Sequence, residues 1–320
     1  MKKDARIKSA LRSKQRGFLL NPFRFATAGS SFAWTSRPLG AANWSGICIS
    51  DDGAKIAACI VSGTVRLSAD NGASWSVATA GTRAWRAIAC SSDGVKLVAA
   101  GTGVTQYCHT SSDSGATWTQ QTGAPVMQWQ GLASSANGEK LLATSNDYVY
   151  TSINSGVSWT QRTPVGFGGT ASSADGVRLA IASGSDYIYT SANSGSSWST
   201  RTGSGARDWS GVDISDDGTK LAACTLNGYI LTSINSGAAW TQRTVAGSRN
   251  WRSISASADG ATIVAAPDDN YIHVSFDGGV TWAAQTTASE SGWISVAISS
   301  DGRFIAAANT TTGIWTASLV

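Results

Sequence analysis

The residues best equipped to bind a polar ligand gather in short segments of this 320-residue chain. The two richest segments hold Arg207, Asp208 and Trp209, and Arg249, Asn250, Trp251 and Arg252. Arg86 and Gln130 each follow a tryptophan in the same way. An aromatic face can stack on a sugar ring while guanidinium, amide and carboxylate groups bind its hydroxyls. The pattern therefore predicts a site for a saccharide.

A plainer interpretation stays open for the same residues. The tryptophans could wedge between packed sheets, and the charged side chains could simply be solvated. Which interpretation holds depends on the elements that carry these segments.

Those elements are repeats. The phrase S-x-[DN]-x-G-x-x-W occurs six times, at intervals of 39 to 43 residues. Its tryptophans are Trp75, Trp118, Trp159, Trp198, Trp240 and Trp282. A period of this length indicates a repeat architecture.

A second phrase, S-x-[DN]-G, occurs seven times outside these boxes, beginning at Ser50 and ending with the copy at Ser299. Asp-Gly or Asn-Gly between apolar runs is a strong hairpin signal. The run after each copy is apolar without alternation, as in "KLAACT", which is typical of a strand buried on both faces. Four strands in each of seven units predict an all-β fold, a seven-bladed β-propeller.

The last unit lacks a fourth strand. The stretch from Ala33 to Arg37 can supply it, because Trp34 lies 41 residues before Trp75 and continues the period. We therefore expect an N-terminal strand to close the ring, with residues 1–30 as a basic arm and residues 31–320 as the propeller.

The six S-x-[DN]-x-G-x-x-W phrases resemble the Asp-box (sialidase/BNR) repeat family. The resemblance implies a propeller with the box at the turn between the third and fourth strands of a blade. Relatives of the repeat include sialidases, sortilin-type receptors, photosystem assembly factors and propeller lectins, so the fold does not choose a function. Boxes with Asn154, Asn193 and Asn235 keep the acceptor and lose the charge, which favours a structural role for the box.

We expect no enzymatic activity and no catalytic residues. The sialidase pattern needs an arginine triad, a Tyr–Glu pair and an acidic partner, but the chain has only Glu139 and Glu290, neither well placed. Glycoside hydrolysis generally requires two facing carboxyl groups. A sialidase-like hydrolase is kept as the weakest alternative.

No metal or cofactor is expected. His109 and His273 fall at equivalent strand positions in different repeats, too far apart to share a metal. No CxxC pair occurs, so the cysteines are interpreted as small buried hydrophobic residues. They are Cys48, Cys59, Cys90, Cys108 and Cys224.

Charge separates the arm from the rest. Residues 1–30 carry a net charge of +7 in a chain of +4, which leaves the propeller at about −3, a poor surface for nucleic acid. No apolar run is long enough for a transmembrane helix, and the patch "GFLLNPFRFA" is too interrupted for a convincing signal peptide.

The arm instead predicts docking to a partner. "RGFLLNPFRFA" resembles N-terminal stretches of phage structural proteins, which implies a larger assembly such as a virion. The expected docking residues are Arg12, Arg16, Phe18, Leu19, Leu20, Phe23 and Phe25. Attachment to a membrane or nucleic acid by charge alone is the competing interpretation.

The sequence thus predicts a non-enzymatic recognition propeller, displayed on a virion or cell surface by its arm, whose variable loops bind surface glycan. A purely structural decoration or assembly protein is the alternative.

Overall fold

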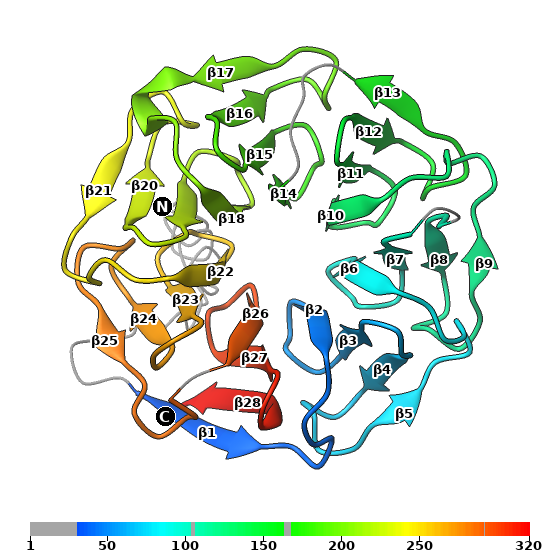
Figure 1. The fold of residues 1–320 in the computed structure, drawn as a ribbon, viewed down its shortest axis with the longest axis horizontal. Helices are drawn as coiled ribbons and strands as arrows, with labels where there is room; N and C mark the ends of the chain where they lie inside the picture. Colours follow the sequence, from blue (N-terminus) through cyan, green and yellow to red (C-terminus); the bar gives the residue numbers. More distant parts are fainter. Residues whose placement is uncertain (1–30, 104–105, 163–167, 291) are drawn as a thin grey trace, which may run out of the picture.

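The computed structural model describes residues 31–103, 106–162, 168–290 and 292–320. The docking residues predicted in the arm lie outside these ranges. So does Phe167, which in the fourth repeat stands where the first strand of the other repeats opens with a tryptophan. These opening tryptophans are Trp44, Trp85, Trp129, Trp209, Trp251 and Trp293. Within them, seven four-stranded antiparallel sheets are arranged as blades of a ring (Figure 1). No helix in the described part of the chain is long and apolar enough to cross a membrane. The seven-bladed propeller is confirmed.

Each blade runs from an inner strand beside the central channel to an outer strand at the rim (Figure 1). The inner strands of blades 1 to 7 are β2 (Trp44–Ile49), β6 (Trp85–Cys90), β10 (Trp129–Ser134), β14 (Gly168–Ser172), β18 (Trp209–Ile214), β22 (Trp251–Ala256) and β26 (Trp293–Ile298). The second strands are β3 (Ile56–Ile60), β7 (Leu97–Gly101), β11 (Leu141–Ser145), β15 (Leu179–Ser183), β19 (Leu221–Thr225), β23 (Ile263–Pro267) and β27 (Phe304–Asn309).

The outer half of each blade is shorter. The third strands are β4 (Val65–Ser68), β8 (His109–Ser111), β12 (Val149–Ser152), β16 (Ile188–Ser191), β20 (Ile230–Ser233), β24 (His273–Ser275) and β28 (Gly313–Leu319). The outer strands are β5 (Ser76–Val77), β9 (Thr119–Gln120), β13 (Thr160–Arg162), β17 (Ser199–Arg201), β21 (Thr241–Arg243), β25 (Ala283–Ala284) and β1 (Phe32–Ser36), and one short 3-10 turn, η1 (Thr202–Ser204), follows β17.

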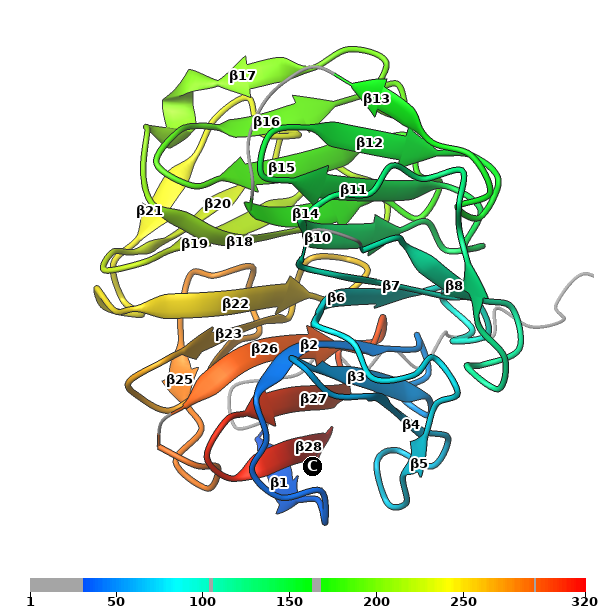
Figure 2. The same cartoon turned by 45° about the vertical axis from the view of Figure 1, so that its right-hand side comes forward.

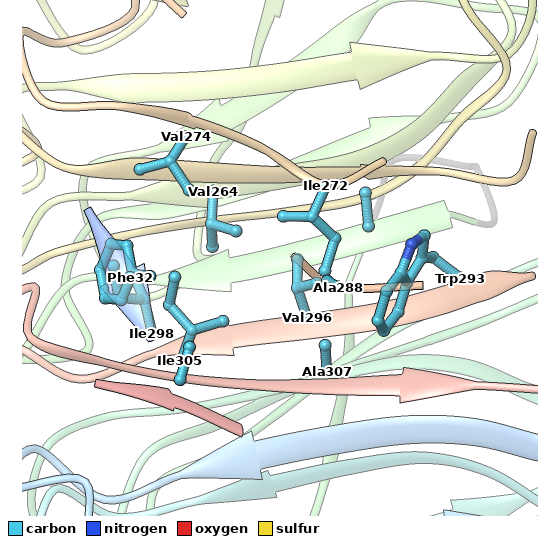
Figure 3. Close-up of a cluster of buried hydrophobic side chains, with 12 residues drawn as sticks. Phe32, Val264, Ile272, Val274, Ala288, Trp293, Val296, Ile298, Ile305 and Ala307 are labelled. Atoms are coloured by element: carbon cyan, nitrogen blue, oxygen red, sulfur yellow. The ribbon is translucent and has the colours of Figure 1, made fainter. Parts of the chain in front are cut away.

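The core lies between blades. Every residue of the second strands β7, β11, β15, β19 and β23 is buried, as their continuous apolar sequences predict. The opening tryptophans pack in this core. For example, the ring centroid of Trp85 lies 6.5 Å from that of the box residue Trp118, and Trp85 meets the His109 ring edge-on at 5.3 Å. Figure 3 shows the equivalent layer around Trp293, where Val264 and Ile272 of blade 6 face Val296 and Ile305 of blade 7.

The N-terminal strand closes the ring as predicted. Strand β1 pairs antiparallel with β28, with Phe32 opposite Leu319 and Ser36 opposite Trp315, and the two strands lie side by side in both views (Figures 1 and 2). Phe32 is buried and stacks on Phe276 of blade 6 at 5.9 Å. The first and last segments of the propeller therefore share one blade and one core.

The S-x-[DN]-x-G-x-x-W phrase is a structural turn. In blade 1, Ser68 Oγ donates to Asp70 Oδ1 at 2.8 Å and accepts from Gly72 N at 2.9 Å, while Asp70 Oδ1 also accepts from Ser74 N at 2.8 Å. The Trp75 indole N–H donates to Gly72 O at 2.9 Å. Asn repeats the acceptor role in three other boxes. The Asp or Asn position of the phrase therefore needs a hydrogen-bond acceptor and does not need a negative charge.

The S-x-[DN]-G hairpins join neighbouring blades. The backbone N–H of the second residue in each phrase donates to the equivalent carbonyl of the next blade, at 2.8 to 3.2 Å, and the last returns to the first. The ring consists of Asp51, Ser92, Ala136, Ala174, Asp216, Ala258 and Ser300. This closed circle of hydrogen bonds holds all seven inner strands at one end of the channel.

One carboxyl group is partly buried beside that circle. Asp213 of β18 accepts hydrogen bonds from Ala256 N (2.8 Å), Ser255 Oγ (3.1 Å) and Ile214 N (2.8 Å). Burial nevertheless outweighs these bonds and raises the pKa of Asp213 to about 6. Ionisation of the Asp213 carboxyl group is therefore less favourable in the folded chain than in the unfolded chain.

Truncation tests ring closure. Removal of residues 1–40 deletes β1, exposes the edge of β28 and uncovers the Phe276 ring, so we expect a lower thermal midpoint and aggregation. Removal of residues 1–28 leaves the blade intact and should match the full chain. Equal thermal unfolding of the two truncations would contradict the closure.

The box turn is tested by Ser68→Ala. The change leaves the buried Gly72 N–H without its acceptor, which should cost about 1–3 kcal/mol in the free energy of unfolding. Asp70→Asn is the matched control, since Asn occupies this position in three boxes, and its unfolding curve should nearly overlay that of the parent. A larger loss for the control than for Ser68→Ala would show that the charge matters after all.

Asp213→Ser tests the buried carboxyl group, because Ser255 stands at the same position in the next blade. The folded pKa of Asp213 lies above its unfolded value, so its stabilisation is complete below about pH 4 and is lost as the pH rises through about 6. Relative to the variant, the parent should lose stability to denaturant across that window. Parallel pH profiles would rule out the raised pKa.

Candidate ligand-binding site at the channel mouth

The two ends of the propeller are built differently. Box turns and hairpin turns share one end, where Asn71 N donates to Ala54 O at 2.9 Å. The loops between second and third strands meet the loops that precede the inner strands at the other end, through the bridges of Gly63 with Arg83 and Gly228 with Arg249. The end opposite the boxes, which we call the variable end, carries all nine predicted ligand residues.

A cavity of about 570 Å³ occupies the mouth of the channel at the variable end. Arg86, Gln130, Asp208 and Arg252 all contribute to its lining, from blades 2, 3, 5 and 6. Three of them stand directly after an opening tryptophan, on inner strands that bulge at this point. The structure therefore brings these four predicted residues to one site, and the largely buried Trp209 is a fifth residue of the lining.

Arg86 and Gln130 form one side of the cavity as a polar chain. The Arg86 Nε–H donates to Gln130 Oε1 at 3.3 Å, and Gln130 Nε2 donates to Asn146 Oδ1 at 2.8 Å. Asn146 Nδ2 in turn donates to Gln128 Oε1 at 3.0 Å. These hydrogen bonds fix both side chains, and no acceptor among the described residues takes up the terminal guanidinium nitrogens of Arg86.

Arg252 forms the opposite side. Its guanidinium donates to Asp268 Oδ2 from Nη2 at 2.7 Å and from Nε at 3.2 Å. Asn250 Nδ2 donates to the same oxygen at 3.4 Å. Both members of the ion pair are about one-third exposed, so the pair positions Arg252 more than it stabilises the fold.

Asp208 is held at the edge of the cavity by Ser185, whose hydroxyl donates to Oδ1 at 2.6 Å. Its second oxygen has no protein donor within the described ranges. Donors from two arginines and a free carboxylate oxygen therefore face one space, an arrangement suited to a ligand rich in hydroxyl groups.

The remaining predicted residues do other work. Arg207 and Arg249 donate to backbone carbonyls of their own loops, at Ser204 (3.0 Å) and Ala246 (3.1 Å), and do not line the cavity. Trp209 and Trp251 are 3% and 0% exposed. The expectation that these two indole rings offer open faces for stacking is corrected: they are wedges of the core, in line with the plainer interpretation.

Blade 4 contributes bare backbone to the wall. A side chain at Gly169 would come within 2.8 Å of Gly211 Cα, and one at Gly168 would overlap the carbonyl of Ala182. The inner strands of blades 4 and 5 therefore pack backbone to backbone at this point.

Sequence reasoning missed several serines of the lining, which are Ser45, Ser185, Ser210, Ser253 and Ser295. Ser45 and Ser210 also donate across the blade interface to the carbonyls of Trp85 (2.9 Å) and Trp251 (2.7 Å). A signal was present for Ser45 and Ser210, because each stands directly after an opening tryptophan, at the position that Arg86, Gln130 and Arg252 occupy in other blades.

Potential catalytic groups are sparse here. Asp208 is the only carboxyl group among the described residues that line the cavity. His109 is buried edge-on to Trp85, and burial lowers its pKa to about 4. No group of three or more metal-ligating side chains occurs in the described part of the chain.

Comparison with known proteins places the fold. No family model matches the chain, and no curated protein matches it. Among solved structures, YCF48 bound to D1 peptide superposes with a TM-score of 0.70 at 16% identity, over 92% of this chain and 99% of that one. YCF48 from Cyanidioschyzon merolae gives 0.69 at 15%, over 89% and 98%.

An enzyme is similar to the same degree. The GH74 enzyme of Niastella koreensis superposes with a TM-score of 0.69 at 16% identity, over 88% of this chain and 53% of the enzyme. At such identities the likeness establishes a shared seven-bladed propeller and nothing finer.

Proposed function

We propose that this protein is a non-enzymatic recognition module that binds surface glycan at the variable end. The observation that carries the proposal is the convergence of Arg86, Gln130, Asp208 and Arg252, from four blades, on one cavity. Guanidinium donors opposite a carboxylate oxygen match the vicinal hydroxyls of a sugar. Hydrogen bonds to neighbouring polar side chains fix the geometry of the site before a ligand arrives.

The absence of catalysis belongs to the same proposal. Hydrolysis of a glycosidic bond generally uses a pair of carboxyl groups about 5 to 10 Å apart, and Asp208 has no such partner in the described lining. The likeness to a GH74 enzyme therefore supports the scaffold and not the reaction.

Display on a larger assembly, with a virion as the leading case, completes the proposal. The basic, aromatic arm of residues 1–30 lies outside the repeats and would be the attachment. YCF48 in complex with a D1 peptide shows that a propeller of this shape can receive a polypeptide. A decoration protein without any ligand is the alternative.

A glycan array probed with the intact protein tests the site. Arg86→Ala, Arg252→Ala and Asp208→Ala should each weaken binding about tenfold or more, since each removes a hydrogen-bonding group worth about 1.4 kcal/mol or more. Arg303→Ala, which removes an exposed arginine at the box end, is the matched control and should bind as the parent does. Only variants whose thermal midpoint matches that of the parent enter the comparison.

Three outcomes would contradict the proposal. A blank array across bacterial polysaccharides favours the decoration protein. Binding that survives all three cavity variants moves the site elsewhere. Release of sugar from any sialoside or polysaccharide would establish an enzyme.

Deletion of residues 1–28 should leave glycan binding intact and abolish attachment to the assembly.

A further inference from the structure

Two cysteines meet across the interface of blades 1 and 2. Cys48 lies on β2 and Cys90 on β6, the inner strands of neighbouring blades (Figure 1). Both belong to the hydrophobic cluster between these blades, with Cys48 buried and Cys90 partly exposed. They are 42 residues apart in sequence, so no local motif announces them.

Each side chain is directed at the strand that carries the other cysteine. Cys90 Sγ lies 3.3 Å from the carbonyl oxygen of Ile49, the residue next to Cys48. The direction of the Cys48 side chain, toward β6, follows from the equivalent positions in other blades. Cys48 and Cys90 occupy the strand positions that Asp213 and Ala256 occupy in blades 5 and 6, and there the Asp213 side chain reaches Ala256 N at 2.8 Å.

The electrostatics agree with this proximity. The pKa of the Cys48 thiol is raised above its usual value, first by a hydrogen bond with Cys90 and second by burial. By contrast, burial alone raises the pKa of Cys108, which has no such neighbour.

The pair is open to small molecules. A cavity of about 210 Å³ at the interface of blades 1 and 2 is lined by both cysteines together with Lys55 and Ser114. The space admits the disulfide end of a small oxidant, and Lys55 at its wall favours an anionic one.

We propose that Cys48 and Cys90 are a site of reversible disulfide formation with a small-molecule disulfide. The thiolate of Cys90, the more exposed of the two, attacks one sulfur of the oxidant and releases one thiolate. The thiolate of Cys48 then attacks Cys90 Sγ in the mixed disulfide and releases the second. The protons of the two cysteines end on the two released thiols, and two electrons pass to the small molecule.

The bond would fasten blade 1 to blade 2 covalently. Closing a loop of this length restricts the unfolded chain and therefore stabilises the ring. Such bonds persist outside cells and are reduced in the cytosol, so the lock would be set when the protein leaves a reducing compartment.

Thiol counting on the intact protein tests the pair. After incubation with oxidised glutathione, unfolding in the presence of a thiol reagent should reveal three free thiols instead of five. Peptide mapping should show one linked pair, Cys48 with Cys90, and reductant should restore all five. Five thiols after oxidation, or a bond to Cys59, would overturn the proposal.

Variants separate this pair from the other thiols. Cys90→Ser and Cys48→Ala copy residues at the same positions of other blades, Ser134 and Ala133, so the fold should tolerate both. Neither should form an intramolecular bond. Cys224→Ser is the control and should still lose two thiols on oxidation. The thermal midpoint should rise on oxidation in the parent and in the control only; a rise in Cys90→Ser would refute the assignment.

Discussion

Closure of the ring is the constraint on which every other feature depends. No blade covers its own faces; each buries its two faces against its two neighbours, so the last blade must meet the first. Two devices achieve this. Strand β1, which is far from β28 in sequence, completes the sheet of blade 7. The backbone hydrogen bonds of the S-x-[DN]-G phrases form an unbroken circle. Because that circle uses only backbone groups, it fixes the inner strands while the residue types at its positions vary.

The two ends of the propeller consequently have different freedoms. At the box end, serine, aspartate or asparagine, glycine and tryptophan satisfy one another within each turn, and substitution is costly. At the variable end, the loops only have to join strands that are already held in place. Side chains such as Arg86, Asp208 and Arg252 can then be placed at the channel mouth at little cost to the fold. This division explains why the polar residues converge where the repeats diverge.

Much of the fold could be predicted from sequence because it repeats. The seven units, the strand order and the closing strand all follow from spacing, and Trp34 marks β1 by period alone. The site was predicted only in part. Local proximity to Trp209 and Trp251 suggested stacking, yet burial between blades decides the environment of those rings. The cavity itself, and the meeting of Cys48 with Cys90, depend on contacts between blades that no single repeat contains.

The channel mouth at the variable end is the proposed ligand-binding site. Amide hydrogen exchange on the intact protein tests this site. Exchange is compared in the absence and in the presence of a glycan that the array identifies as a ligand. We expect the glycan to slow exchange in the segments around Arg86, Gln130, Asp208 and Arg252, and to leave exchange in the box turns unchanged. Protection confined to the box end, or protection nowhere in the ring, would contradict it.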